Sequence, residues 1–279
     1  MRLATIRTAD GATRAVRVED DRLVDLGAAD VGELLARRAR GGSGPTGDGA
    51  TYPLDGADYA PVVPRPGKIV CVGLNYRNHI LEMGRDLPEH PTLFSKFAET
   101  LVGARDDIVR PAETTQFDWE AELAVVIGRP VRRAGEREAI EAIGGFTVLN
   151  DVTCRDWQFR TREWLQGKNW EATTPLGPWL VTPDELPGGV RPKLDISTEL
   201  DGETVQQDNT ADLLFDPVAL VEYISTIATL KPGDVIATGT PGGVGHARKP
   251  PRYMRAGQRL VTSVDGLGHC ANLVVDGGA

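Results

Sequence analysis

The chain has 279 residues, a formal net charge of −9, 41% hydrophobic residues and 25% charged residues. These proportions are those of a soluble globular protein and exclude a wholly disordered chain. Nucleic acid is not expected as a partner, because binding a phosphate backbone requires a broad basic face. A small anionic substrate is still compatible with an acidic chain, since local cations or a metal can reverse the field inside a cleft.

The three cysteines are Cys71, Cys154 and Cys270, and they show neither a CxxC motif nor a Cys/His ligand spacing. We therefore expect reduced thiols rather than disulfides or a zinc site. The opening MRLATIRTADG lacks the apolar stretch of a signal peptide, and no apolar run approaches membrane-spanning length. These features predict a cytoplasmic protein without membrane association.

The first part of the chain, residues 1–66, is predicted to form a small β-rich N-terminal domain. Its expected elements are strands over 2–8, 13–18 and 22–27 and a helix over 31–40. Residues 40–50, RGGSGPTGDGA, are rich in glycine and predict a flexible loop. The following PVVPRPG has three prolines in seven residues and predicts a linker, which places the domain boundary near residue 66.

Residues 67–279 are predicted to form the main, catalytic domain. Strands are expected over 68–74, 122–128, 144–153, 193–200, 233–240, 259–268 and 270–275, and helices over 137–144, 155–165 and 216–230. Strands dominate, and they do not alternate regularly with helices. The pattern therefore predicts an α+β, mainly β fold rather than a doubly wound sheet.

Two carboxylates, Glu120 and Glu122, occur at the head of the apolar run in FDWEAELAVVIG. Residues i and i+2 of a strand point to the same face, so these side chains would converge. Paired carboxylates repel and raise each other's pKa unless a cation lies between them, and Mg²⁺, Mn²⁺ or Ca²⁺ suits such oxygen ligands. The alternative is an exposed strand edge with two solvated glutamates, which the motif alone favours.

A third carboxylate, Asp151, ends another apolar run in FTVLNDVTCRD. Three carboxylates on an octahedral divalent ion would leave about three open positions, which is typical of a catalytic site. The sequence itself does not show that Asp151 meets the two glutamates.

His79 and Glu82 are spaced i, i+3 in GLNYRNHILEMG and would share one face of a short helix. A carboxylate beside an imidazole raises its basicity, as a general base that activates water requires. The bracketing glycines indicate a segment that moves as a lid. The alternative is a surface helix with an incidental pair. His90, in the loop that follows, is assigned no role.

Lys168 lies among Trp164 and Trp170 in LQGKNW, where partial desolvation would make its charge available to an anionic intermediate. An ordinary surface lysine is the alternative, and Lys96 in LFSKFAET is a weaker candidate of the same kind. The stretch ATGTPGGVG lacks the ending of a nucleotide-binding P-loop. Its backbone amides and the Thr240 hydroxyl could instead hold a carboxylate.

Taken in order, several stretches resemble the fumarylacetoacetate hydrolase family, in particular its bacterial fumarylpyruvate/acylpyruvate hydrolase and 2-hydroxyhepta-2,4-diene-1,7-dioate isomerase-like branch. The matching stretches are VGLNYRNHILEMG, LFSKFAETLVG, DWEAELAVVIG, NDVTCRDWQ, GKNWEATTPLGPWLVTPDEL, GETVQQDNTADLLFD, LKPGDVIATGTPGGVG and GQRLVTSVDGLGHCANLVV. The resemblance runs from about residue 66 to the end. It implies a mixed β-sandwich roll, with the small N-terminal domain as an appendage, and a homodimer.

The resemblance also implies residue roles. The metal ligands would be Glu120, Glu122 and Asp151, which would bind Mg²⁺ or Mn²⁺, with Ca²⁺ as a substitute. The catalytic residues would be His79, Glu82 and Lys168. The substrate contacts would be Arg155, Gln158, Gly239 and Thr240, to which we add Lys96. Two histidines depart from the family pattern. His246 lies near the pocket loop, where it could tune substrate choice, and His269 is expected to be structural.

The activity that this site implies is metal-dependent hydrolysis of a carbon–carbon bond in a ketonic substrate. A 2,4-dioxo acid such as fumarylpyruvate would be cleaved to pyruvate and a carboxylic acid, as in aromatic catabolism. His79 would deprotonate water, and a divalent cation with Lys168 would stabilise the leaving enolate. The alternatives are decarboxylation of oxaloacetate, isomerisation or hydration of a 2-hydroxydienoate or 2-oxo acid, and a non-catalytic binding protein.

Overall fold

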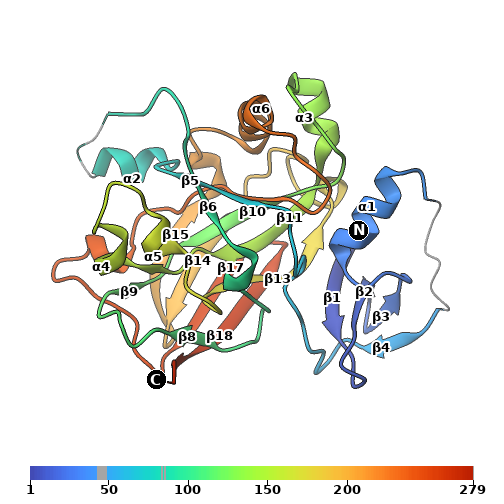
Figure 1. Ribbon diagram of the computed structural model, residues 1–279, viewed down its shortest axis with the longest axis horizontal. Helices are drawn as coiled ribbons and strands as arrows, with labels where there is room; N and C mark the ends of the chain where they lie inside the picture. The colour runs from blue at the N-terminus through green and yellow to red at the C-terminus, as the bar shows by residue number, and fades with distance from the viewer. Residues whose placement is uncertain (43–48, 83, 85, 279) are drawn as a thin grey trace.

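A computed structural model describes residues 1–42, 49–82, 84 and 86–278, without the side chains of His79 and Glu82. Most of its regular structure is strand, and the helices are few and short (Figure 1). This confirms the predicted α+β, mainly β class. Residues 43–48 of the predicted flexible loop lie outside the described residues.

The larger sheet has eleven strands and runs through both parts of the chain. Its strand order is β4-β3-β2-β1-β13-β11-β10-β16-β5-β6, with β7 paired to β13. The strands are β1 (Arg2–Arg7), β2 (Thr13–Glu19), β3 (Arg22–Asp25), β4 (Thr51–Pro53), β5 (Ile69–Gly73), β6 (Thr92–Lys96), β7 (Leu101–Val102), β10 (Ala121–Ile127), β11 (Ile143–Asn150), β13 (Thr174–Val181) and β16 (Val235–Ala237). Because Leu3 of β1 pairs with Leu180 of β13, the N-terminal strands extend the main sheet. The division into 1–66 and 67–279 stays a prediction.

A second sheet of five strands packs against the first. Its order is β15-β14-β17-β18-β8, from β8 (Ile108–Arg110), β14 (Asp195–Leu200), β15 (Glu203–Asn209), β17 (Arg259–Val264) and β18 (Gly268–Asp276). A short pair joins β9 (Phe117–Asp118) to β12 (Thr153–Cys154). Leu123 and Val125 of β10 share one apolar core with Ile196 of β14 and Val264 of β17. The two sheets therefore form a sandwich.

The helices lie at the edges of this sandwich. They are α1 (Val31–Ala39), α2 (Arg77–Glu82), α3 (Glu136–Ala142), α4 (Arg155–Gln158), α5 (Leu165–Lys168) and α6 (Pro217–Ile227), with 3-10 turns η1 (Ala98–Thr100), η2 (Pro183–Glu185), η3 (Thr210–Asp212) and η4 (Gly245–Ala247). α6 begins where Asp216 accepts hydrogen bonds from the N–H groups of Val218 and Ala219. α3 and α6 lie together at the top of Figure 1, whereas α2, α4 and α5 gather on the left. No helix in the described ranges has the length and apolar character needed to cross a bilayer.

The single helix predicted over 155–165 is wrong. The structure has two separate turns, α4 and α5, joined by bends over 159–164. Gly167 of α5 packs directly on Gln158 of α4, and a Cβ at Gly167 would lie 2.4 Å from the Gln158 Cβ. One continuous helix would hold these residues apart, so the chain must double back.

The order of the central strands brings the ends of four strands together at one edge of the sheet. β10 runs antiparallel to both neighbours, β11 and β16, while β5 is parallel to β16. The amino end of β10 therefore lies beside the carboxyl ends of β5, β11 and β16. Every residue of β10 is buried, so side chains at this end are held rigidly.

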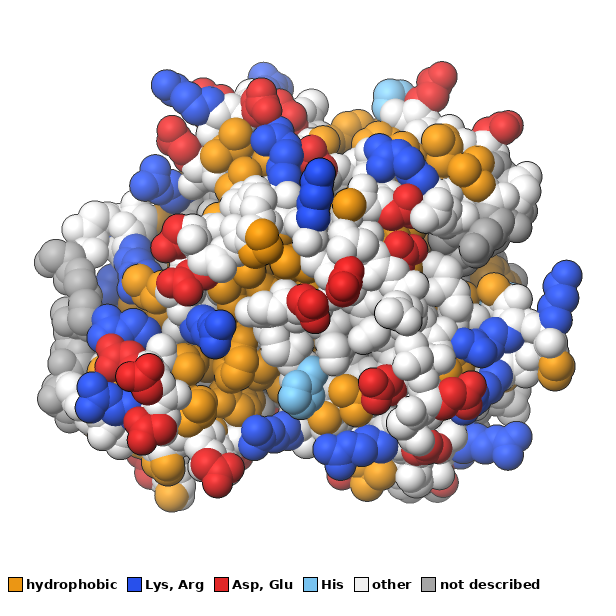
Figure 2. All heavy atoms as spheres, turned by 180° about the vertical axis from the view of Figure 1, so that it is seen from behind, with side chains coloured by type: hydrophobic (Ala, Val, Ile, Leu, Met, Phe, Trp, Pro, Cys, Tyr) orange, Lys and Arg blue, Asp and Glu red, His pale blue; other side chains and the backbone are white. Residues whose placement is uncertain are grey.

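The surface opposite the view of Figure 1 carries both signs of charge. Figure 2 shows Lys and Arg side chains intermixed with Asp and Glu side chains over this face. The described part of this face therefore lacks a broad surface of a single charge.

Candidate active site

Three carboxylates meet at the amino end of β10. Ala121 of β10 pairs with Asn150 of β11, which sets the flanking Glu120 and Asp151 opposite each other. The Asp151 N–H donates to the Glu120 carbonyl at 2.8 Å. One carboxylate oxygen each of Glu120, Glu122 and Asp151 lies within 4.8 Å of the others, and all three residues are buried. The structure thus brings together the predicted ligands, two of them separated by one residue in the sequence and one from the end of the next strand.

Two buried lysines contact this cluster. The Lys168 ammonium, at the end of α5, donates to Glu120 Oε2 at 2.8 Å and to Asp151 Oδ2 at 2.7 Å. Lys96 Nζ lies 2.7 Å from Asp151 Oδ1, and both of those side chains are fully buried. Lys168 lines the neighbouring cavity, whereas Lys96 is absent from the described lining. Lys96, predicted as a substrate contact, therefore lies behind Asp151.

Glu122 is the carboxylate without a cationic partner. It is 1% exposed, and its Oε2 accepts one hydrogen bond of 2.7 Å from the Gly239 N–H. In the described chain no Lys or Arg side chain forms an ion pair with it. Burial, reinforced by the charges of Asp151 and Glu120, raises the pKa of Glu122 well above its usual range.

The charges around this cluster do not balance. The buried carboxylates are Asp118, Glu120, Glu122 and Asp151, and the buried cations are Lys96, Arg155 and Lys168. Among the described residues, one negative charge is in excess when all four carboxylates are ionised, and a buried charge without a partner is strongly unfavourable. A hard divalent cation held by Glu120, Glu122 and Asp151 would remove this excess, and carboxylate oxygens are the ligands that such ions prefer. The residues present therefore fit a magnesium-type site.

Arg155 connects the cluster to its surroundings. Its guanidinium lies 2.7 Å from Glu120 Oε1 through Nη2 and donates to Asp118 Oδ2 through Nε at 2.8 Å. Nη1 donates to Gln158 Oε1 at 2.9 Å. Burial alone would lower the pKa of Arg155, but the charges of Asp118 and Glu120 outweigh burial and raise it. Arg155, predicted to contact the substrate, thus orients Glu120 and Gln158.

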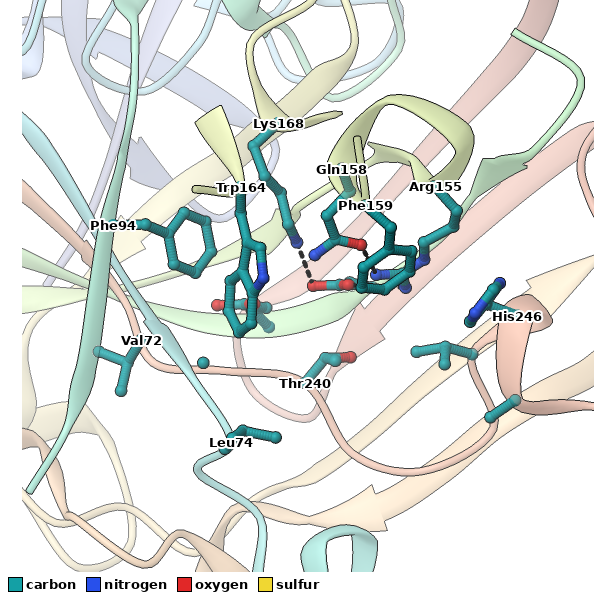
Figure 3. Close-up of a pocket in the computed structure, with 15 residues that line it drawn as sticks. Val72, Leu74, Phe94, Arg155, Gln158, Phe159, Trp164, Lys168, Thr240 and His246 are labelled. Atoms are coloured by element: carbon teal, nitrogen blue, oxygen red, sulfur yellow. Dashed lines mark hydrogen bonds and ion pairs between the residues drawn. The ribbon is translucent and has the colours of Figure 1, made fainter. Parts of the chain in front are cut away.

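A cavity of about 230 Å³ opens next to the carboxylates (Figure 3). Lys168, Gln158 and Arg155 lie along one side of it, and Thr240 faces them. Its lining residues are Val72, Gly73, Leu74, Phe94, Glu120, Glu122, Arg155, Gln158, Phe159, Trp164, Lys168, Thr240, Val244, His246 and Ala247. The aromatic walls Phe94, Phe159 and Trp164 were not predicted from the sequence. No local signal separates them from ordinary core or surface rings.

The loop after β16 contains Gly239 and Thr240, two residues that were predicted to contact the substrate. The Gly239 N–H is directed to Glu122, so it supports a candidate metal ligand. The Thr240 hydroxyl oxygen accepts a hydrogen bond from Gln206 Nε2 at 2.9 Å, which leaves its own proton for the cavity. Gly239 has φ +99°, and a Cβ there would lie 2.9 Å from the Val72 carbonyl oxygen. Only glycine fits this position without strain.

His79 and Glu82 both belong to α2, which follows the cavity-lining Leu74. The Asn78 N–H donates to Asp212 Oδ2 at 2.8 Å, which anchors the helix to η3. The side chains of His79 and Glu82 lie outside the described structure, as do residues 83 and 85 of the predicted lid. Their roles stay predictions.

Asp118 supports the site but was not predicted from the sequence. Its carboxylate is fully buried and accepts four hydrogen bonds. The donors are the N–H groups of Trp119, Gly245 and His246 and the Arg155 Nε. The available signal was its place two residues before Glu120.

Comparisons with known proteins agree with this fold. The mitochondrial oxaloacetate tautomerase of Homo sapiens is 43% identical over 218 residues, covering 77% of this chain and 68% of that protein. A fumarylacetoacetate hydrolase from Exiguobacterium antarcticum has a TM-score of 0.88 at 32% identity, covering 99% of this chain and 100% of its own. The 2-hydroxyhepta-2,4-diene-1,7-dioate isomerase from Mycobacterium marinum has a TM-score of 0.81 at 30% identity, covering 100% of both chains. The family model described as fumarylacetoacetate (FAA) hydrolase C-terminal matches residues 68–275, and the chain belongs to this family.

Proposed function

We propose that this protein is a divalent-metal-dependent hydrolase that cleaves the carbon–carbon bond of a 2,4-dioxo acid, such as fumarylpyruvate, into pyruvate and a carboxylic acid. The observation that carries this proposal is the buried Glu122, which has no cationic partner among the described residues and lies beside the Lys168-bridged Glu120 and Asp151. Such a cluster at the floor of a cavity suits a cation and an anionic substrate together.

The residues of the chain would bind and stabilise the substrate as follows. When bound, a divalent cation would polarise the oxygens of a 2-oxo acid and stabilise developing negative charge. The Lys168 ammonium has three N–H groups, and two already point to Glu120 and Asp151, so one is left for a substrate oxygen. The amide nitrogen of Gln158 and the hydroxyl of Thr240 also face the cavity as donors, because their oxygens accept from Arg155 and Gln206. This donor-rich lining supports an oxyanion-stabilising role.

Water activation is assigned to His79 and Glu82 on α2. With Glu82 orienting the imidazole, His79 would take a proton from water as it attacks the distal carbonyl. We expect His79→Ala to abolish hydrolysis while Mg²⁺ binding, measured by calorimetry, is unchanged. A near-wild-type hydrolytic rate would contradict this role.

A second candidate is keto–enol isomerisation of oxaloacetate. It is supported by the human relative, which is named an oxaloacetate tautomerase. The same donors would stabilise the enolate, and the reaction needs no attacking water. Decarboxylation of oxaloacetate and isomerisation of a 2-hydroxydienoate use the same intermediate type.

One assay series separates these activities. The purified protein is incubated with Mg²⁺ and fumarylpyruvate, acetylpyruvate or oxaloacetate, while ultraviolet absorbance and pyruvate formation are followed. Loss of diketone absorbance with formation of pyruvate supports hydrolysis. Loss of oxaloacetate enol absorbance without pyruvate supports tautomerisation, and pyruvate from oxaloacetate supports decarboxylation. Absence of Mg²⁺ binding together with inactivity on all three would favour a non-catalytic binding protein.

We also propose a cytoplasmic homodimer. The resemblance to the family supports dimerisation, and the exposed Phe97, Leu165 and Leu273 offer apolar surface for contacts between subunits. Sedimentation velocity at micromolar concentration tests this, with a monomer as the contradicting result.

A further inference from the structure

His246 lines the cavity on the side away from Lys168 (Figure 3). Its Nδ1 lies 2.9 Å from the hydroxyl of Tyr253, a residue outside the cavity lining. In the described part of the chain, Nε2 has no protein partner. Nε2 is therefore the ring nitrogen that is available to a ligand.

The position of this imidazole is set by the fold. The His246 N–H donates to Asp118 Oδ2 at 3.0 Å, and the neighbouring Gly245 N–H donates to Oδ1 at 2.7 Å. A Cβ at Gly245 would lie 1.8 Å from the Arg252 carbonyl, so the turn requires glycine there. The ring also contacts Phe159, with 5.2 Å between ring centroids. Backbone, hydroxyl and aromatic contacts together preorganise the side chain.

The contact with Tyr253 bears on which nitrogen of the ring carries the proton. Burial, followed by the charge of Arg155, lowers the pKa of His246, so the imidazole is neutral near pH 7. Burial raises the pKa of Tyr253, and its phenol keeps its proton. With Tyr253 donating to Nδ1, which is the tautomer that the inference below requires, the ring proton lies on Nε2.

We propose that His246 is a specificity-determining residue whose Nε2–H donates to a terminal carboxylate at the far end of an extended 2-oxo acid. This inference rests on the proposed function, because it assigns the 2-oxo acid end of the substrate to the carboxylate cluster, Lys168 and Thr240. Between Lys168 and His246 the cavity is lined by the ring of Phe159, which suits an uncharged carbon chain (Figure 3). The favoured substrates are therefore dicarboxylic 2-oxo acids rather than equally long acids that end in a methyl group.

The test compares binding of two unreactive acids of equal chain length. 2-Oxoadipate ends in a carboxylate, 2-oxohexanoate ends in a methyl group, and oxalate probes the metal end alone. Affinities are measured by calorimetry with saturating Mg²⁺ for the wild type and for His246→Phe, His246→Gln and Tyr253→Phe. His269→Phe, at an exposed position of β18, is the matched control.

We expect His246→Phe to weaken 2-oxoadipate binding about tenfold, because a hydrogen bond to a charged group is lost. Binding of 2-oxohexanoate and oxalate should stay unchanged, His246→Gln should restore part of the affinity, and Tyr253→Phe should show an intermediate loss. His269→Phe should alter none of the three. Unchanged 2-oxoadipate binding in His246→Phe, with oxalate still bound, would overturn this inference alone. Failure of the wild type to bind oxalate would overturn the proposed function and this inference with it.

Discussion

The floor and the mouth of the cavity are built on different physical principles. At the floor, Lys96, Glu122 and Asp151 are at most 3% exposed. Lys96 forms an ion pair with Asp151, and Glu122 accepts a hydrogen bond from a backbone N–H. At the mouth, Phe159 is 56% exposed and contacts the His246 ring. The difference indicates that the chemistry depends on groups locked in place, whereas selectivity depends on side chains that can be exchanged at small cost in stability.

The largest expected effect follows from removing the unpaired charge at the floor. Glu122→Gln keeps the size of the side chain but lacks the carboxylate that a cation requires. We expect Mg²⁺ affinity to fall by at least about a hundredfold, since even residues supporting a ligand commonly cost that much. The free energy of unfolding without metal should stay equal or rise, because an amide avoids the cost of either ionising or protonating a buried carboxylate.

Calorimetry with Mg²⁺ and denaturant unfolding in EDTA would measure the two effects of Glu122→Gln. Glu120→Ala is a less selective variant, because Glu120 also pairs with Lys168 and Arg155. Unchanged Mg²⁺ affinity in Glu122→Gln would contradict the assignment of this residue as a ligand.

The next largest effect separates the two lysines. Lys96→Met removes a partner of Asp151, and we expect the free energy of unfolding to fall by about 3 kcal/mol. Lys168→Met breaks the same kind of buried pair but also removes the donor that faces the cavity. The kcat of Lys168→Met should therefore be ~100-fold lower than that of Lys96→Met. Equal kcat values for the two variants would show that the cavity-facing position has no special role.

A smaller effect is expected at the wall between floor and mouth. A Cβ at Gly73 would lie 2.5 Å from the Trp164 ring, so Gly73→Ala should displace the indole. We expect a loss of about 1–3 kcal/mol in stability and a raised KM. The double variant with Trp164→Leu should recover stability relative to Gly73→Ala alone. Strictly additive effects would exclude this contact.

The smallest effect is expected at the mouth. Phe159→Leu exchanges an exposed ring, so the free energy of unfolding should change by less than about 0.5 kcal/mol. KM should change for long substrates, while kcat and oxalate affinity stay the same. A large loss of stability would contradict the description of the mouth as a replaceable surface.

Parts of this architecture were predictable from the sequence because they depend on neighbouring residues. The period of two along a strand places Glu120 and Glu122 on one face, and the apolar run after them predicts a buried strand. The pairing of Ala121 with Asn150, which brings Asp151 to the cluster, is a long-range register that no local pattern encodes. The residues alone left the metal-ligand interpretation open beside a solvated strand edge, and the resemblance to the family favoured the metal ligands.

Other features depend on contacts that a linear pattern does not contain. Lys96 and Lys168 have the flanking sequences of ordinary surface lysines, yet both are buried because carboxylates from other strands meet them. The helix predicted over 155–165 is interrupted because Gly167 must approach the backbone of Gln158. The addition of β1 to the edge of β13 likewise depends on a pairing across most of the chain.

Asp118 has a consequence for how such a protein can evolve. Its carboxylate holds the turn at residues 245 and 246 through backbone N–H groups, which every non-proline amino acid provides. Replacement of the side chain at position 246 therefore leaves this support, and the link through Arg155 to the floor, unchanged. Mutation can alter substrate choice at this position in a single step, without passing through an inactive or unfolded ancestor.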